Sequence, residues 1–170
     1  KRVLNIAAAD GTGIVRTMPC PGEYCEPTDW HPDTGAMLVN VVDARGWDVW
    51  TVPTREGGKA EPLLAESYSE RDARFSPDGR WIAYASGESG QSEVSVRSVS
   101  APPARVPLSP GGGAQPVWRR DGRELFYVEP RGGLQSVAVR FGRNGTPEFG
   151  LPSALPVPPV GFGHWGTQYD

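Results

Sequence analysis

The chain has 170 residues, of which 38% are hydrophobic and 22% charged, with a formal net charge of -3 and a pI near 5.4. This acidic balance gives no basic field for nucleic acid, and no apolar run approaches the roughly twenty residues that insert into a membrane as a helix. The length suggests one domain, and 22 Gly with 18 Pro favour many short strands joined by turns.

The N-terminal residues predict a β-hairpin. Residues 3–8 and 14–18 are the two expected strands, and the Gly-rich segment 10–13 is the turn between them. Their place before the first repeated segment, described below, suggests the third and fourth strands of a sheet whose first half would precede residue 1.

Two cysteines follow the hairpin in a turn-rich link. A disulfide between Cys20 and Cys25 would staple this link in an oxidising compartment, and two free thiols are the alternative. No metal is expected, because a zinc site needs about four ligands and neither His31 nor His164 belongs to a Cys/His cluster.

Three later segments are versions of one another. Each places an aromatic residue before a turn and an alternating apolar run, and the aromatics Trp30, Phe75 and Trp118 are separated by 45 and 43 residues. A second marker begins 18 residues after each aromatic, at Asp48, Glu93 and Ser136. This period is typical of the four-stranded blade of a β-propeller.

The two later copies divide into strands with period-two alternation. The expected strands are residues 73–75, 81–85, 94–99 and 105–108 in one copy, and residues 116–118, 124–128, 135–140 and 148–150 in the other. No segment has helical spacing of its apolar residues, so no helix is expected.

The sequence therefore predicts an all-β fold, a partial β-propeller of about three and a half to four four-stranded antiparallel blades. The expected divisions are 1–26 as the end of a blade, 27–69, 70–112 and 113–160 as blades, and 161–170 as the start of the next. Closed propellers have about four to eight blades. We therefore expect either a longer parent protein or self-association of two copies to close the propeller.

The unit aromatic-Ser-Pro-Asp-Gly at residues 75–79 resembles the TolB-type, WD-repeat-like propeller repeat of many bacterial proteins, and the resemblance covers about residues 28–157. The runs 73–84 and 111–127 are similar to the C-terminal propellers of some bacterial serine/threonine protein kinases. This similarity implies a recognition or sensor module outside the membrane, in the periplasm or at the cell surface. Two turns depart from the pattern, at residues 31–35 and at Arg119-Arg120.

No catalytic constellation emerges. The motif G-x-S-x-G is absent, and residues 161–166 match G-x-G-x-x-G only after a Pro-rich stretch that predicts no strand. We expect a non-enzymatic module without a cofactor. Two alternatives stay open: an accessory propeller that gates substrate to a hydrolase or peptidase domain outside this chain, and a purely structural, self-assembling fragment.

Propeller geometry predicts where a ligand would bind. Loops that enter the first strand of each blade, and loops that join its second and third strands, gather on one face around the channel. The candidate residues there are Trp47, Glu70, Arg71, Asp72, Arg74, Gln115, His164 and Trp165. Their mixed charges and aromatic rings suit a protein partner or a small polar ligand. By contrast, we expect Trp30, Phe75 and Trp118 to pack between neighbouring sheets.

Overall fold

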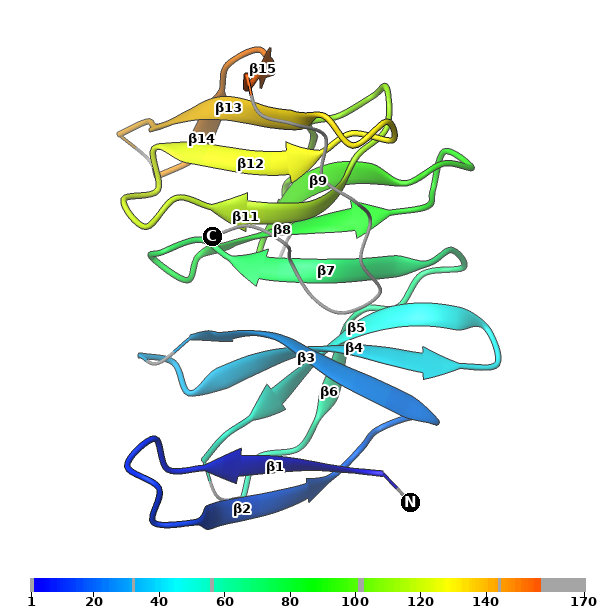
Figure 1. The fold of residues 1–170 in the computed structure, drawn as a ribbon, viewed down its shortest axis with the longest axis vertical. Coiled ribbons are helices and arrows are strands. Elements are labelled where there is room, and N and C mark those ends of the chain that lie inside the picture. Colours follow the sequence, from blue (N-terminus) through cyan, green and yellow to red (C-terminus); the bar gives the residue numbers. More distant parts are fainter. Residues whose placement is uncertain (1, 32, 56, 101–102, 144, 157–170) are drawn as a thin grey trace.

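In the computed structural model, the described part of the chain comprises residues 2–31, 33–55, 57–100, 103–143 and 145–156. These residues form antiparallel strands and turns, and none of them lies in a helix. Figure 1 shows the sheets stacked in chain order, from the N-terminal hairpin at the bottom to the last sheet at the top. The prediction of an all-β, partial propeller is confirmed.

The first sheet is the expected hairpin, β1 (Val3–Ala7) with β2 (Ile14–Pro19). The next sheet contains β3 (Tyr24–His31), β4 (Ala36–Asp43), β5 (Gly46–Pro53) and β6 (Glu61–Leu64). Its first strand begins at Tyr24, so it crosses the division expected at residue 27. Consecutive strands are neighbours in this sheet, which is the meander of a propeller blade.

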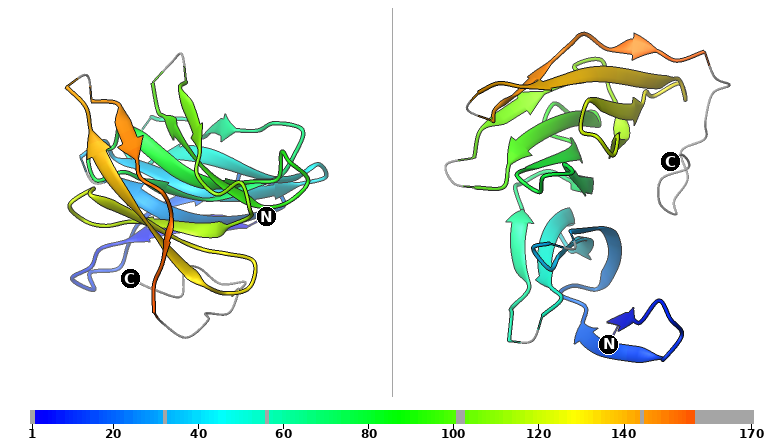
Figure 2. Two further views of the ribbon diagram at one scale, coloured as in Figure 1. Left: turned by 90° about the horizontal axis from the view of Figure 1, so that it is seen from above. Right: turned by 90° about the vertical axis from the view of Figure 1, so that its left-hand side faces the viewer.

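The other two sheets repeat this order. One contains β7 (Glu70–Phe75), β8 (Trp81–Ser86), β9 (Glu93–Ser98) and β10 (Arg105–Pro107). The other contains β11 (Ala114–Trp118), β12 (Glu124–Val128), β13 (Leu134–Phe141), β14 (Pro147–Phe149) and β15 (Ser153–Ala154). Both β14 and β15 pair with β13, so together they make an interrupted fourth strand. Seen from above, successive sheets are rotated relative to one another (Figure 2).

The turn between the first and second strands is set by a short polar motif. In the turn after β7, the Ser76 hydroxyl donates to the Asp78 carboxylate (2.6 Å), and the Arg80 amide donates to the same oxygen (3.1 Å). Gly79 adopts φ +68°, which L side chains avoid. The turn after β11 keeps this geometry, with Gly122 at φ +70°, so replacing Ser-Pro by Arg119-Arg120 leaves the turn type intact.

Apolar residues fill the space between neighbouring sheets, because alternate residues of one strand face opposite sheets. Leu38 packs with the β7–β10 sheet, whereas Met37 and Val39 pack against Leu4 and Met18 of the hairpin. The largest cluster joins the last two sheets and contains Trp81, Ala83, Val94, Val96, Leu108, Trp118, Leu125, Tyr127, Val137 and Val139.

The three repeated aromatics do not share one environment. Phe75 and Trp118 are buried, with 8% and 7% of their surface exposed, but Trp30 is 45% exposed. The Trp118 ring N–H donates to the carbonyl of Arg74, in the first strand of the preceding sheet (3.2 Å). In the part of the chain that the structure describes, the sheet before Trp30 has only β1 and β2. The expectation that Trp30 packs between two sheets is therefore wrong, since no described first strand covers it.

Candidate binding face

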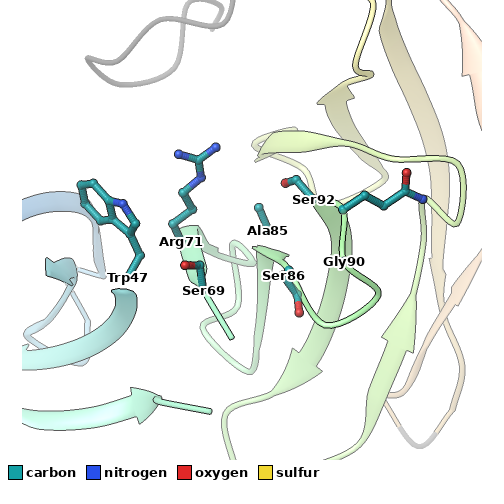
Figure 3. A pocket seen from close by; sticks show the side chains of 9 residues that line it. Trp47, Ser69, Arg71, Ala85, Ser86, Gly90 and Ser92 are labelled. Carbon is teal, nitrogen blue, oxygen red and sulfur yellow. The ribbon is translucent and has the colours of Figure 1, made fainter. Parts of the chain in front are cut away.

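A pocket opens where three loops meet on one face of the stack (Figure 3). It has a volume of about 300 Å³ and is lined by Trp47, Ser69, Arg71, Ala85, Ser86, Gly87, Gly90, Gln91 and Ser92. These residues come from the β4–β5 hairpin, the link into β7 with its first residues, and the β8–β9 connection. They are the two kinds of loop that propeller geometry brings together, and two of the candidates from sequence, Trp47 and Arg71, meet here.

Trp47 forms one wall of the pocket. It lies at the start of β5, opposite Val42 of β4, and its ring meets the ring of Tyr24 edge to face, with centroids 6.0 Å apart and planes at 82°. In Figure 3 its indole stands beside the Arg71 side chain and points the same way. The Tyr24 contact limits the freedom of a ring that is only half buried.

Arg71 owes its position to an irregularity in β7. The pairing with β8 shifts between Arg71 and Arg74, and Asp72 adopts φ +58°. Such bulges bend a strand and redirect its side chains. The buried Asn40 side chain of the neighbouring sheet accepts from the Asp72 amide (3.0 Å), so a contact between sheets stabilises the bulge.

The same irregularity recurs in β11, where Gln115 adopts φ +52°. Asp72 and Gln115 both lie three residues before the repeated aromatic of their strand. The matching residue of β3 is Pro27, whose ring cannot adopt a positive φ, and there the irregularity falls between Pro27 and Asp29. The sequence did not predict the positive φ in these two copies, because Asp and Gln indicate a left-handed conformation less clearly than Gly does.

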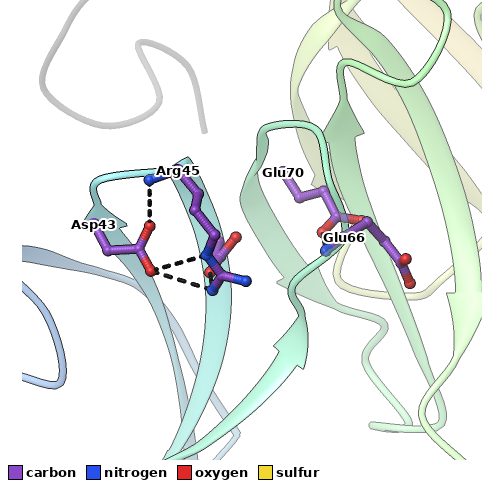
Figure 4. Close-up of polar contacts among 5 residues, drawn as sticks. Asp43, Arg45, Glu66 and Glu70 are labelled. Carbon is purple, nitrogen blue, oxygen red and sulfur yellow. Dashed lines mark hydrogen bonds and ion pairs between the residues drawn. The ribbon is translucent and has the colours of Figure 1, made fainter.

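Glu70 does not line the pocket, although the sequence analysis placed it on the same face. Only 1% of its surface is exposed, and its carboxylate accepts from the Glu66 amide (3.1 Å). Burial raises the pKa of Glu70, the nearby Glu66 and Asp48 raise it further, and the hydrogen bond and Arg97 oppose the shift. Glu70 is therefore part of the interior between two sheets (Figure 4).

A second polar group in Figure 4 lies in the β4–β5 hairpin. Arg45 forms ion pairs with Asp43 and Asp48, each at 3.2 Å. Asp48 is 3% exposed, and its burial raises its pKa, with Arg45 opposing the shift. The hairpin next to Trp47 thus carries an ion-pair network in which Arg45 is exposed, Asp43 is partly exposed and Asp48 is buried.

The remaining candidate residues from the sequence differ in whether they reach the pocket. Asp72 borders the pocket, where its carboxylate lies 3.8 Å from Nε of Arg71. Arg74 turns away from it, because its guanidinium donates to the carbonyl of Thr28 in the preceding sheet. Gln115 is 7% exposed and is not among the lining residues. His164 and Trp165 lie outside the described residues.

Sequence reasoning missed several lining residues. Ser69, Gln91 and Ser92 sit in polar turns whose composition signals a loop but not a pocket. The Gly- and Ser-rich segment 86–92 was the available signal, since small residues leave room between adjacent loops.

The structure joins Cys20 and Cys25 in a disulfide, with Cα atoms 5.9 Å apart. No cluster of three or more His, Cys, Asp or Glu residues that could hold a metal ion occurs within the described ranges. Across those same ranges, no helix is long and apolar enough to cross a membrane.

Comparison with solved structures shows which known fold this chain shares. The chain superposes on a TolB protein of Agrobacterium tumefaciens with a TM-score of 0.60 and 18% identity, over 76% of this chain and 50% of that one. For TolB of Acinetobacter baumannii the TM-score is 0.54 with 17% identity, over 86% of this chain and 37% of that one.

In sequence, the chain is 33% identical over 133 residues to Tricorn protease homolog 1 of Streptomyces coelicolor, a match that covers 77% of this chain but 12% of that protein. The chain thus spans about half or less of the length of the TolB structures and a small part of the protease homologue. No family profile matches it. The fold of this chain is that of the TolB-like β-propellers, as an arc of three four-stranded blades and a preceding hairpin.

Proposed function

We propose that this chain is a non-catalytic recognition module that binds a protein partner through the pocket between the β4–β5 hairpin, the link into β7 and the β8–β9 loop. One observation carries the proposal: Trp47 and Arg71, from adjacent sheets, line one open pocket. Trp and Arg are over-represented among the residues that dominate binding energy at protein interfaces. The sheets below them supply a rigid support, as in other folds that bind through loops.

Site-specific photocrosslinking tests this function. A photoreactive benzoyl-phenylalanine replaces the exposed lining residue Ser69 in one variant, Gln91 in a second, and the 91% exposed Leu151 in a control. We expect the same partner, identified by mass spectrometry, to be attached at the first two positions and not at the third. Equal labelling at all three positions, or none at the pocket, would contradict the proposal.

We also propose an extracytoplasmic location. The Cys20–Cys25 disulfide supports it, because disulfides persist in oxidising compartments. We further propose that the parent protein is a receptor-like kinase, on the resemblance to kinase propellers that the sequence of residues 73–84 and 111–127 suggested. Alkylation of cell extracts before and after reduction measures the bridge in its native compartment, and free thiols there would argue against export.

A second candidate function rests on the likeness to Tricorn protease homolog 1. In that case the propeller is an accessory domain that gates peptides to a hydrolase domain of the parent. Peptidase assays of the parent with and without residues 1–170 separate the two functions. Unchanged cleavage of long and short peptides after removal favours recognition alone.

We further propose that copies of the chain associate through the two ends of the stack. Trp30 is exposed at one end, and Phe126 is half-buried at the other. Phe126 occupies the repeat position at which Leu38 and Ala83, in the two preceding sheets, are completely buried. Light scattering across a dilution series tests whether copies cover these surfaces. A stable monomer at all concentrations would refute it.

A further inference from the structure

Resting on the proposed recognition function, we propose that this pocket binds a peptide carboxylate. The Arg71 guanidinium forms the ion pair, and the Trp47 indole covers an apolar side chain next to that carboxylate. The ligand class is therefore an acidic group beside an aromatic or large aliphatic residue.

Arg71 is the one charged side chain among the described residues that line the pocket. Its side chain is 44% exposed, and its ion pair with the Asp72 carboxylate is long, 3.8 Å from Nε. In Figure 3 the terminal nitrogens point up, away from the floor made by Ala85 and Ser86. A guanidinium presents paired N–H donors in one plane, which match the two oxygens of a carboxylate.

Carboxylates that neighbour the lining residues in the sequence have partners other than Arg71. Glu93 accepts from the Gln91 side-chain amide at 3.0 Å, Asp48 pairs with Arg45 at 3.2 Å, and the buried Glu70 accepts from the Glu66 backbone amide. None of these contacts involves Arg71. An incoming carboxylate would thus meet a cation whose closest acid, Asp72, is a weak competitor.

The backbone beneath Arg71 is built to hold this orientation. Asp72 is a non-Gly residue at φ +58°, a conformation that costs free energy and persists only where neighbours enforce it. Asn40, which is 2% exposed, holds this conformation because its side-chain oxygen accepts a hydrogen bond from the Asp72 amide. Strain of this kind concentrates at binding sites, because it positions side chains that relaxed strands would aim elsewhere.

Trp47 supplies the apolar half of the site. Its ring is braced by Tyr24, so little conformational entropy is lost when a ligand packs on it. Gly87 and Gly90 on the opposite side carry no side chains that would fill the space. A flat ring facing small residues accommodates an aromatic or large aliphatic side chain.

Such a carboxylate has two sources, an internal Asp or Glu and a peptide C-terminus. Three probes distinguish them: N-acetyl-Phe-Glu-amide, its Gln analogue, and N-acetyl-Phe with a free carboxylate. Binding of each to the whole chain is followed by NMR through the indole N–H of Trp47 and Nε–H of Arg71. The last probe carries its charge on the C-terminus.

We expect one of the two charged probes to shift both signals and the Gln analogue to bind at least about tenfold more weakly, the factor for losing a charge-assisted hydrogen bond. Arg71→Gln should remove this preference. The matched control is Arg131→Gln, which changes an exposed arginine in the loop between β12 and β13 of the next sheet, and this variant should bind as the unsubstituted chain does.

If neither charged probe binds more tightly than the Gln analogue, or if Arg71→Gln has no effect, the carboxylate assignment is overturned, as it is if every probe fails to shift Trp47. The outcome is separable from the proposed function: if crosslinks still form at positions 69 and 91, the pocket recognises a protein by other chemistry. If those crosslinks are absent while the charge preference holds, the carboxylate site stands and the protein-binding function fails.

Discussion

Gly79 of one blade lies directly against the imidazole of His31 in the preceding blade. A methyl group on Gly79 would lie 2.8 Å from both Cδ2 and Cε1 of that ring, and closer still to Nε2. His31 is itself 6% exposed and stacks edge to face on Phe75, with centroids 5.3 Å apart. The turn of one blade is therefore packed against the turn of the next through a glycine and a buried histidine.

Gly79→Ala should destabilise the fold by about 2 to 4 kcal/mol, the sum of a left-handed residue with a Cβ and an overpacked contact. Urea unfolding measures the loss. Gly90→Ala is the control, because Gly90 also has a positive φ but nothing lies within 4 Å of an added Cβ. Gly90→Ala should cost only about 1 to 2 kcal/mol. Equal losses would show that the His31 contact contributes nothing.

The two tryptophans of the repeat should respond differently to truncation. Trp118→Ala should cost about 3 to 5 kcal/mol, because a large buried side chain leaves a cavity and the Arg74 carbonyl loses its hydrogen bond. Trp30→Ala should cost under about 1 kcal/mol, since nearly half of that residue is already in water. Denaturant unfolding of the two variants provides the comparison. A loss at Trp30 as large as at Trp118 would mean that another surface covers Trp30.

The repeat in the sequence was sufficient to predict the second strands of the two later blades, whereas the first strands begin earlier than expected, at Glu70 and Ala114. Residues 81–85 and 124–128 were expected as strands and match β8 and β12 within one residue, because a period of two and the Asp-Gly turns constrain them locally. Burial of the aromatics was harder to predict. It depends on which strands of the preceding sheet lie beside the ring, and the described sheet before Trp30 has only β1 and β2.

The candidate face was predicted in part, for a related reason. Trp47 and Arg71 could be placed by loop type alone, and they share a pocket. Glu70 and Arg74 come from the same strand as Arg71 but point into contacts between sheets. Their direction is set by the irregularity at Asp72, which depends on Asn40 in another blade. A contact of this range leaves no pattern in the strand itself.

The Cys20–Cys25 bridge should stabilise the junction between the hairpin and the next sheet. Closing so short a loop removes about 2 kcal/mol of unfolded-state entropy in the chain-entropy account. We expect the double variant Cys20→Ser/Cys25→Ser to lose about that much stability and to exchange the amides of β1 and β2 faster. Hydrogen exchange resolves the two strands. Reducing agent should destabilise the parent chain but not the variant, and unchanged exchange in the variant would show that apolar packing alone holds the hairpin.

Glu70 should make the protein less stable as the pH rises. Burial raises its pKa above the ordinary 4.5, so between that value and the folded pKa the folded state retains a proton that the unfolded state has released. Stability from this group is therefore greatest below pH 4.5 and falls as the pH rises through the folded pKa.

Glu70→Gln keeps a carbonyl that can accept the hydrogen bond from the Glu66 amide, and it removes the buried charge. We expect the variant to match or exceed the parent in stability at pH 7 and to lose that advantage at pH 4, in urea unfolding at both values. The opposite result would be a variant that loses stability against the unsubstituted chain at pH 7 but not at pH 4. It would mean that the hydrogen bond stabilises the ionised carboxylate by more than burial destabilises it.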